Sequence, residues 1–348
     1  MGATNNSNST SRQSRYNGWS WPPHPFQPIA WGCLIYLSIF YFSTIEPGLL
    51  QPGRIAGYAV MGLLLVIHFV VHILACTVNP ADPNVIRKME GKKRQEMPTF
   101  DRTKHKHVIE NQHCYLCDVN VADKSKHCSA CNKCVSNFDH HCKWLNNCVG
   151  DRNYRLFIAT LVTAIAGAII IVSLCLMQFV AYFTDRNSGS LLQQYRDALA
   201  LPTSSTGNVT VMSTPPPVSI TTAANYSGKT SPVPTAQKPV FRVLWVVVSD
   251  RLWLAMVMLT ALLALTGMGL LGHLLGFHVY LMYRGISTYE YVVQLREKAE
   301  KEAREKQMEG GKIELANSKS SKVCSNGRNK THGIFILSCA YHVHMCTL

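Results

Sequence analysis

Four stretches of the chain are rich in apolar residues and contain no Asp, Glu, Lys or Arg: residues 29–45, 55–78, 156–183 and 252–283. A helix needs roughly 20 apolar residues to cross the hydrocarbon core of a bilayer, within a range of about 17–25. The first stretch is near the lower limit. The last is longer than needed, so we expect its helix to tilt or to continue into the aqueous phase. Because buried core helices seldom lack charge over such lengths, the pattern predicts an all-α membrane protein with four transmembrane helices.

Polar segments divide the chain around these helices. A Ser-, Asn- and Pro-rich arm precedes the first two spans and is predicted to be disordered. A charged, cysteine-rich segment separates spans 2 and 3. A Ser-, Thr- and Pro-rich loop, predicted to be mostly disordered, separates spans 3 and 4, and a charged tail follows, helical over residues 292–312. The predicted divisions are the arm 1–28, the hairpin of spans 1 and 2 at 29–83, the cysteine-rich segment 84–155, span 3 at 156–183, the loop 184–251, span 4 at 252–283 and the tail 284–348.

The basic residues are unevenly placed, which predicts the orientation in the membrane. Fourteen Lys or Arg lie in residues 84–155 and eleven follow Tyr283, whereas only four lie in residues 184–240. Basic loops stay in the cytosol, so the arm, the cysteine-rich segment and the tail are predicted to be cytosolic and the loop after span 3 lumenal. Asn208 and Asn225 begin glycosylation sequons in that loop, which agrees with this orientation.

The net charge of +14 is explained by this topology and by anionic lipid headgroups. Nothing interleaves aromatic residues with the basic ones, so nucleic acid is not an expected partner. The interpretation favours a multi-pass protein of an endomembrane such as the endoplasmic reticulum, Golgi or endosome.

Seven of the thirteen cysteines fall between Cys114 and Cys148, together with His127, His140 and His141. Thiols on the cytosolic side stay reduced, which argues against disulfides. Pairs of cysteines spaced C-x-x-C with histidines nearby are typical of zinc ligands. Two tetrahedral sites need eight ligands and the segment offers ten, so two side chains are left for other chemistry.

The sequence Asp139-His140-His141-Cys142 is the place where such chemistry is expected. A cysteine is a nucleophile as thiolate, which a nearby histidine can generate. A carboxylate can orient that histidine and stabilise its charged form. From ligand counting alone, the alternative that all these residues are ligands of a purely structural zinc module stays open.

Two weaker patterns have simpler interpretations. His68 and His72 share one face of span 2 and could bind a metal, but no acidic residue lies between them as in a zincin motif, so hydrogen bonding between helices is favoured. Gly267, Gly269 and Gly272 spell a dinucleotide-binding motif, but no strand precedes them. Close helix packing explains these glycines better.

The spacing from Cys114 to Phe157, C-x2-C-x9-H-C-x2-C-x2-C-x4-D-H-H-C-x5-C-x4-N-x3-F, resembles without a gap the cysteine-rich domain of the DHHC protein S-acyltransferases, or palmitoyltransferases. Residues 82–84, Asp-Pro-Asn, resemble the DPG motif of that family, with Asn for Gly. Residues 287–290, Ser-Thr-Tyr-Glu, resemble its TTxE motif, with Ser for the first Thr. The resemblance implies four spans with a cytosolic, loop-rich, two-zinc domain between helices 2 and 3.

The resemblance also implies a role for each residue of the cluster. Cys142 would be the nucleophile and His140 its base, Asp139 would orient His140, and Thr288 would hydrogen-bond Asp139. The other side chains would hold two structural Zn²⁺ ions, one bound by Cys114, Cys117, His127 and Cys134, the other by Cys128, Cys131, His141 and Cys148.

The implied activity is protein S-palmitoylation. Cys142 would take a long-chain acyl group from acyl-CoA and pass it to cysteine thiols of substrate proteins, mostly membrane-associated, at the cytosolic face. The acyl chain would lie among the spans in the lipid bilayer. The alternatives are a catalytically inactive zinc-bearing membrane scaffold and a zinc adaptor for ubiquitin transfer. Cys142 argues against the scaffold, which would not need a thiol outside the zinc sites.

Overall fold

The computed structural model describes residues 13–50, 52–90, 100–101, 103–185, 240–244 and 246–317. Within these ranges, four helical segments are long and apolar enough to cross a membrane: Phe26–Gly48, Gly53–Thr77, Tyr154–Thr184 and Asp250–Arg284. They coincide with the four uncharged stretches, so the predicted spans are confirmed. The last two are 31 and 35 residues long, more than a perpendicular crossing needs.

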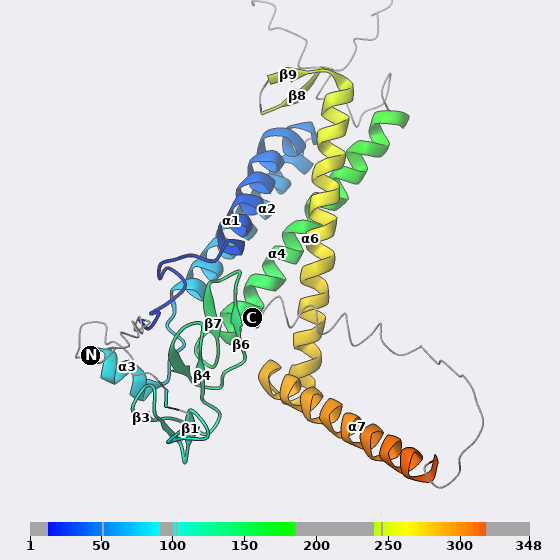
Figure 1. Cartoon of the computed structure of the whole chain (residues 1–348). Helices are drawn as coiled ribbons and strands as arrows, with labels where there is room; N and C mark the ends of the chain where they lie inside the picture. The colour runs from blue at the N-terminus through cyan, green and yellow to red at the C-terminus, as the bar shows by residue number, and fades with distance from the viewer. Residues whose placement is uncertain are drawn as a thin grey trace, which may run out of the picture. The chain divides into compact units, whose positions relative to one another are not determined.

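The first span is built of three pieces. Helix α1 (Phe26–Phe40) continues as a π-helical turn, η1 (Tyr41–Ile45), and ends in a 3₁₀ turn, η2 (Glu46–Gly48). Proline lies at the second position of η2, where its missing N–H costs nothing. The other spans are α2 (Gly53–Thr77), α4 (Tyr154–Thr184) and α6 (Asp250–Arg284), each a continuous α-helix (Figure 1).

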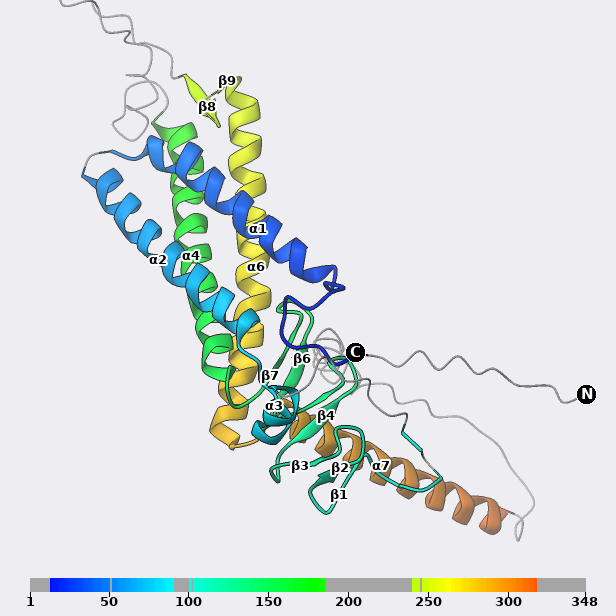
Figure 2. The ribbon, with the colours of Figure 1, turned by 90° about the vertical axis from the view of Figure 1, so that its left-hand side faces the viewer.

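The chain divides into two compact units. The first contains residues Met1–Tyr36, Leu63–Ala168 and Thr266–Leu348, and the second contains Leu37–Gly62 and Ile169–Leu265. In the first unit, short strands and the helix α3 (Pro83–Glu90) gather where α2 ends and α4 begins (Figures 1 and 2). This group is the predicted cysteine-rich domain between spans 2 and 3.

The cysteine-rich domain is made of strands of two or three residues. A three-stranded antiparallel sheet joins β1 (Ile109–Glu110), β2 (His113–Cys114) and β3 (Val119–Asn120). Two hairpins follow, of β4 (Lys126–Cys128) with β5 (Lys133–Val135) and of β6 (His140–Cys142) with β7 (Asn147–Val149). Such short strands are not stable by themselves, so the domain needs further cross-links.

Asp82 ties the end of span 2 to this domain. One carboxylate oxygen, Oδ1, accepts the amide of Asn84 at 3.0 Å and so caps α3, whose first residue is Pro83. The other, Oδ2, accepts the amide of Ala122 at 3.1 Å and the hydroxyl of Ser125 at 2.8 Å. The Asp-Pro-Asn motif is therefore a helix start whose capping side chain also binds a loop of the cysteine-rich domain.

The tail after span 4 begins with helix α7 (Thr288–Asn317), which confirms the helix predicted over residues 292–312. The backbone amide of Ser287 donates to Glu290 Oε2 at 2.8 Å, and the amide of Glu290 donates to Ser287 Oγ at 3.1 Å. This reciprocal pair is a capping box. The serine that replaces the first threonine of the TTxE motif supplies the hydroxyl that this cap requires.

The N-terminal arm, predicted to be disordered, is ordered from residue 13 onward, which corrects that prediction for its second half. The backbone amide of Arg15 donates to Cys131 O at 2.8 Å, and the buried ammonium of Lys133 donates to Tyr16 O at 2.7 Å. Composition alone could not predict this, because these two partners lie more than 100 residues further along the chain. The first twelve residues of the arm lie outside the described residues.

The second unit contains the remaining parts of the four spans, in residues Leu37–Gly62 and Ile169–Leu265. Here Gln178 donates from Nε2 to Ile45 O at 2.7 Å, which links α4 to the end of the first span. The predicted disordered loop lies mostly outside the described residues, but its end forms a hairpin of β8 (Phe241–Val243) and β9 (Val246–Val248). The ring of Phe241 stacks on Trp253 at 4.4 Å between centroids.

Candidate active site and metal clusters

The strand β6 separates its three functional side chains by simple alternation. Successive side chains of a strand point to opposite faces, so His140 and Cys142 share one face and His141 occupies the other. In the register with β7, His141 lies opposite Cys148, and directly opposite residues share a face. His141 and Cys148 therefore face away from the pair His140 and Cys142.

The same rule applies to the preceding hairpin. His127 of β4 lies opposite Cys134 of β5, so these two share a face. Cys128, the next residue along β4, points to the other face. The adjacent residues His127 and Cys128 of β4 thus belong to two different clusters.

The structure brings together two groups of four possible metal ligands, and these are the two sets that the family resemblance implied. In each group the donor atoms lie within 4.8 Å of one another. The first group is Cys114, Cys117, His127 and Cys134, and the second is Cys128, Cys131, His141 and Cys148.

Both groups fit a metal by their chemistry as well as their distances. The backbone amide of Cys117 donates to Cys114 Sγ, and that of Cys131 donates to Cys128 Sγ, each at 3.4 Å. The six cysteines are buried, so a metal held there would be shielded from water. Three thiols and one imidazole per group suit tetrahedral zinc, so both clusters could hold metal ions, consistent with zinc.

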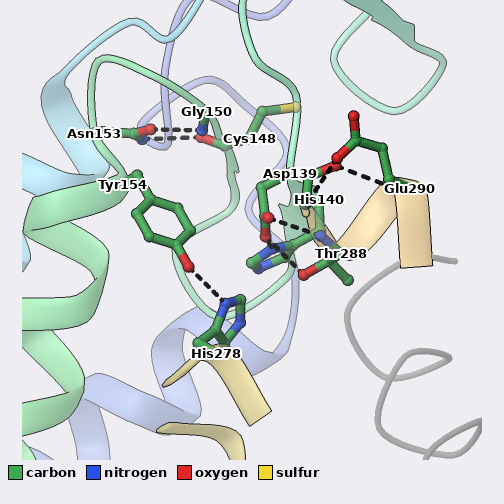
Figure 3. Close-up of polar contacts among 10 residues, drawn as sticks. Asp139, His140, Cys148, Gly150, Asn153, Tyr154, His278, Thr288 and Glu290 are labelled. Carbon is green, nitrogen blue, oxygen red and sulfur yellow. Dashed lines mark hydrogen bonds and ion pairs between the residues drawn. The ribbon is translucent and has the colours of Figure 1, made fainter. Parts of the chain in front are cut away.

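Asp139 and His140 form a buried, directly bonded pair. The Nδ1 atom of His140 donates to Asp139 Oδ2 at 2.7 Å, and the two side chains are 1% and 5% exposed. From the start of α7, Thr288 donates its amide to Oδ1 at 2.9 Å and its hydroxyl to Oδ2 at 2.8 Å (Figure 3). Thr288 therefore makes the expected hydrogen bond to Asp139 with its hydroxyl and a second one with its backbone amide.

The surroundings shift the pKa values of this group in directions that favour charge separation. Burial opposes ionisation of Asp139, but the hydrogen bond and charge of His140, the charge of His278 and the amide of Thr288 together outweigh it and hold the pKa of Asp139 below its usual value. Burial acts to lower the pKa of His140, yet Asp139 and the Cys142 thiol together raise it to about 9. Burial acts to raise the pKa of Cys142, but His140 brings it below the ordinary value. Both shifts act in favour of a thiolate beside an imidazolium.

The free nitrogen of His140 is placed for proton transfer. Among the described residues, its Nε2 atom is buried and has no hydrogen-bond partner. Cys142 is also buried, in an apolar cluster that contains Cys76, Leu145 and Phe157. The pair can therefore exchange a proton with a reacting group without competition from another side chain.

The last residues of the sequence pattern hold the ring of His140 and the start of α4. Asn153 accepts the amide of Gly150 at 3.0 Å and donates to Cys148 O at 2.9 Å. One turn later, the Phe157 ring meets His140 edge to face at 5.2 Å between centroids. The N-x3-F spacing thus puts, on one side of the helix, an asparagine that ties the helix start to the preceding loop and an aromatic ring that contacts His140.

Two residues beside this site were missed by the sequence reasoning. His278 of α6 is 1% exposed, and its Nδ1 atom lies 3.2 Å from the hydroxyl oxygen of Tyr154 (Figure 3). Its ring centroid is 5.6 Å from that of His140. A histidine inside an apolar span is itself a signal of function, which could have singled out His278.

One member of the histidine pair of span 2 has a simpler role. His68 Nδ1 lies 2.9 Å from Thr163 Oγ1, a hydrogen bond between α2 and α4. Among the described residues, neither His68 nor His72 joins a group of three or more possible metal ligands. This agrees with the interpretation favoured above.

Comparison with known proteins supports the family resemblance that the cysteine and histidine spacing indicated. The sequence model of the family described as DHHC palmitoyltransferase matches residues 107–295. The chain is 43% identical to Palmitoyltransferase ZDHHC1 of Danio rerio over 82% of this chain and 44% of the relative. It is 41% identical to Palmitoyltransferase ZDHHC1 of Mus musculus over 86% of this chain and 54% of the relative, and 41% identical to Palmitoyltransferase ZDHHC11 of Danio rerio over 82% and 58%. The chain thus spans about half the length of these curated relatives.

Proposed function

Because the chain belongs to the DHHC palmitoyltransferase family, we propose that it is a protein S-palmitoyltransferase that takes its acyl group from acyl-CoA and carries it on Cys142. One observation supports this most strongly. Cys142 and His140 share a face of β6 outside both four-residue clusters, and His140 is bonded through Asp139 to Thr288. This arrangement offers a nucleophile, a base and an orienting carboxylate.

In the first step, the Cys142 thiolate attacks the thioester carbonyl of acyl-CoA. A bond forms between this sulfur and the acyl carbon, and the bond from that carbon to the sulfur of coenzyme A breaks. The departing thiolate takes the proton that His140 carries on its free nitrogen. Asp139 keeps the other nitrogen of His140 protonated, so the ring presents Nε2 to the reaction.

In the second step, a cysteine thiol of the substrate protein attacks the acyl-Cys142 thioester. His140 removes the proton of the incoming thiol, and Cys142 leaves as the thiolate. Both groups are then in their starting forms. The cycle consumes one acyl-CoA and one protein thiol, and it releases coenzyme A and the acylated protein.

The remaining parts of the domain and the spans serve this reaction by position. Zinc in the two clusters would be structural, because each closed set of four ligands leaves no open position for a substrate. The zinc of the second cluster would join β4 to β7 through Cys128 and Cys148. Each buried CH₂ of an acyl chain contributes about 0.8 kcal/mol, so the chain would lie among the spans with its thioester at the cytosolic face. The substrates would then be proteins held at that membrane surface.

A chase experiment tests the two-step transfer. The purified full chain is loaded with labelled palmitoyl-CoA, freed of donor by rapid gel filtration and mixed with a peptide containing one cysteine. Label should move from protein to peptide in the absence of donor, and His140→Ala should slow this movement by about a hundredfold. Transfer that requires the continued presence of palmitoyl-CoA would contradict an acyl-enzyme. A folded, metal-containing protein that takes up no label would favour the scaffold.

A further inference from the structure

His278 is a buried polar residue for which the proposed reaction steps give no role. It lies ten residues before Thr288, near the end of α6, in a run that contains no Asp, Glu, Lys or Arg. An imidazole costs free energy in such surroundings unless its nitrogens find partners. Its presence beside the catalytic pair therefore calls for a physical reason.

The contacts of His278 lead from span 3 to the catalytic histidine. Its Nδ1 atom and the hydroxyl oxygen of Tyr154 are 3.2 Å apart, which fixes the orientation of the ring. Its ring meets Phe157 edge to face at 4.9 Å and lies 5.6 Å from His140, both between centroids. Phe157 and His278 thus touch each other, and each also lies against the ring of His140.

His140 needs such support because its hydrogen bond to Asp139 fixes only one ring atom. A ring held at Nδ1 can still swing about that bond, and the swing moves Nε2, the atom that must exchange a proton. Misplacement of a catalytic group by about 1 Å is enough to lower a rate substantially. Contacts on the ring faces and edges remove this freedom.

The same three residues could also be considered as a metal site, since atoms of Asp139, His140 and His278 lie within 4.8 Å of one another. However, the Asp139 carboxylate already accepts three hydrogen bonds, one from His140 and two from Thr288. A cation would have to compete with these three hydrogen bonds for the carboxylate. The hydrogen-bonded arrangement favours positioning over metal binding.

We propose that His278, held by the hydroxyl of Tyr154, is a positioning residue that fixes the ring of His140 for proton exchange. The inference rests on the proposed acyl-transfer function. The segment that joins α6 to α7 then supports two neighbouring residues of the site. His278, near the end of α6, supports His140, and Thr288, at the start of α7, supports Asp139. The fourth span thereby becomes part of the catalytic apparatus.

Single-turnover acylation of Cys142 by labelled palmitoyl-CoA tests this with variants of matched shape. His278→Phe keeps a ring against Phe157 but loses the nitrogen that meets Tyr154, and Tyr154→Phe removes only the hydroxyl oxygen. Each should lower the maximal rate about tenfold, the effect of one buried hydrogen bond, and leave the half-saturating donor concentration within about twofold. The double variant should be no slower than either single one, because both remove the same contact. His273→Phe, at an exposed position of the same helix, should react like the wild type.

The outcomes separate this inference from the proposed function. Two metal ions per chain in every variant would show that the domain remains folded, and three in the wild type would overturn positioning in favour of a metal site. A wild-type rate in His278→Phe or Tyr154→Phe, or losses that multiply in the double variant, would also overturn it. His278→Asn, which keeps an acceptor near the place of Nδ1, should recover part of the rate. If instead the wild type forms no Cys142-dependent adduct, the proposed function itself fails.

Discussion

At the scale of single residues, the alternation of side chains along β6 decides what each residue can do. His140 and His141 are neighbours of the same type, yet one lies on the face with Cys142 and the other on the face with Cys148. The sequence of residue types alone could not show which of the two histidines is a metal ligand and which acts with Cys142. The family resemblance implied the assignment, and the pleat of the strand gives its physical reason.

Thr288 offers a test of how Asp139 is held. Thr288→Val removes the hydroxyl that donates to Oδ2 at 2.8 Å and leaves the backbone bond to Oδ1 intact. We expect single-turnover acylation to slow by about tenfold to a hundredfold, the effect of one lost hydrogen bond to a charged group. Thr184→Val, at an exposed position at the end of α4, is the matched control and should react normally. Equal rates for the two variants would show that the hydroxyl of Thr288 does not contribute.

Sequence reasoning reached most of the residues of this site and missed His278 and Tyr154. The cysteines, the histidines and Asp139 are close in sequence, so their spacing is recognisable. His278 and Tyr154 are 124 residues apart and meet only when α4 and α6 pack together. No local pattern predicts that contact, although a histidine within an apolar span indicates a functional position.

At the scale of elements, the metal clusters are expected to stabilise a domain whose strands are too short to do so alone. Cys128 belongs to the second cluster, whereas Cys142 belongs to neither. We expect the wild type and Cys142→Ser to bind two zinc ions per chain, measured by elemental analysis, and Cys128→Ala to bind fewer and to lose the fold of the domain. Equal loss of metal in both variants would mean that Cys142 is a ligand.

The ordered part of the N-terminal arm makes a second prediction at this scale. A methyl group on Gly18 would collide with the carbonyl oxygens of Leu145 and Cys76, both of which are backbone atoms. Gly18→Ala should therefore destabilise the protein by about 1–3 kcal/mol, measured by thermal unfolding in detergent. Gly32→Ala is the control, because nothing lies within 4 Å of its added carbon. An unchanged unfolding temperature for Gly18→Ala would show that the arm is not packed against the domain.

The arm also shows why some elements could not be predicted. Its Ser, Asn and Pro content is typical of disorder, and the four spans were predictable because each is a long local run of apolar residues. The arm is ordered by partners elsewhere in the chain, such as Lys133 for Tyr16 and Asn146 for Gly18. Local composition cannot reveal distant partners.

At the scale of the whole molecule, the four spans make this a multi-pass membrane protein, and the basic residues predict its orientation. The loop after span 3 should be lumenal. We expect Asn208 and Asn225 to be glycosylated in cells and the two sequon-like asparagines of the arm, Asn5 and Asn8, to be unmodified. Replacement of Asn208 and Asn225 by Gln should remove a glycosidase-sensitive mass shift. A shift that instead depends on Asn5 or Asn8 would invert the predicted topology.

The identity of the acyl carrier is the central claim, and thioester labelling of the purified protein tests it most directly. After incubation with labelled palmitoyl-CoA, the wild type should carry one adduct that hydroxylamine releases, and Cys142→Ser should carry none while it retains two zinc ions. Cys33→Ser, which alters a cysteine of α1 outside the cluster, should label like the wild type. Hydroxylamine-sensitive labelling that survives in Cys142→Ser would contradict the assignment of Cys142 as the nucleophile.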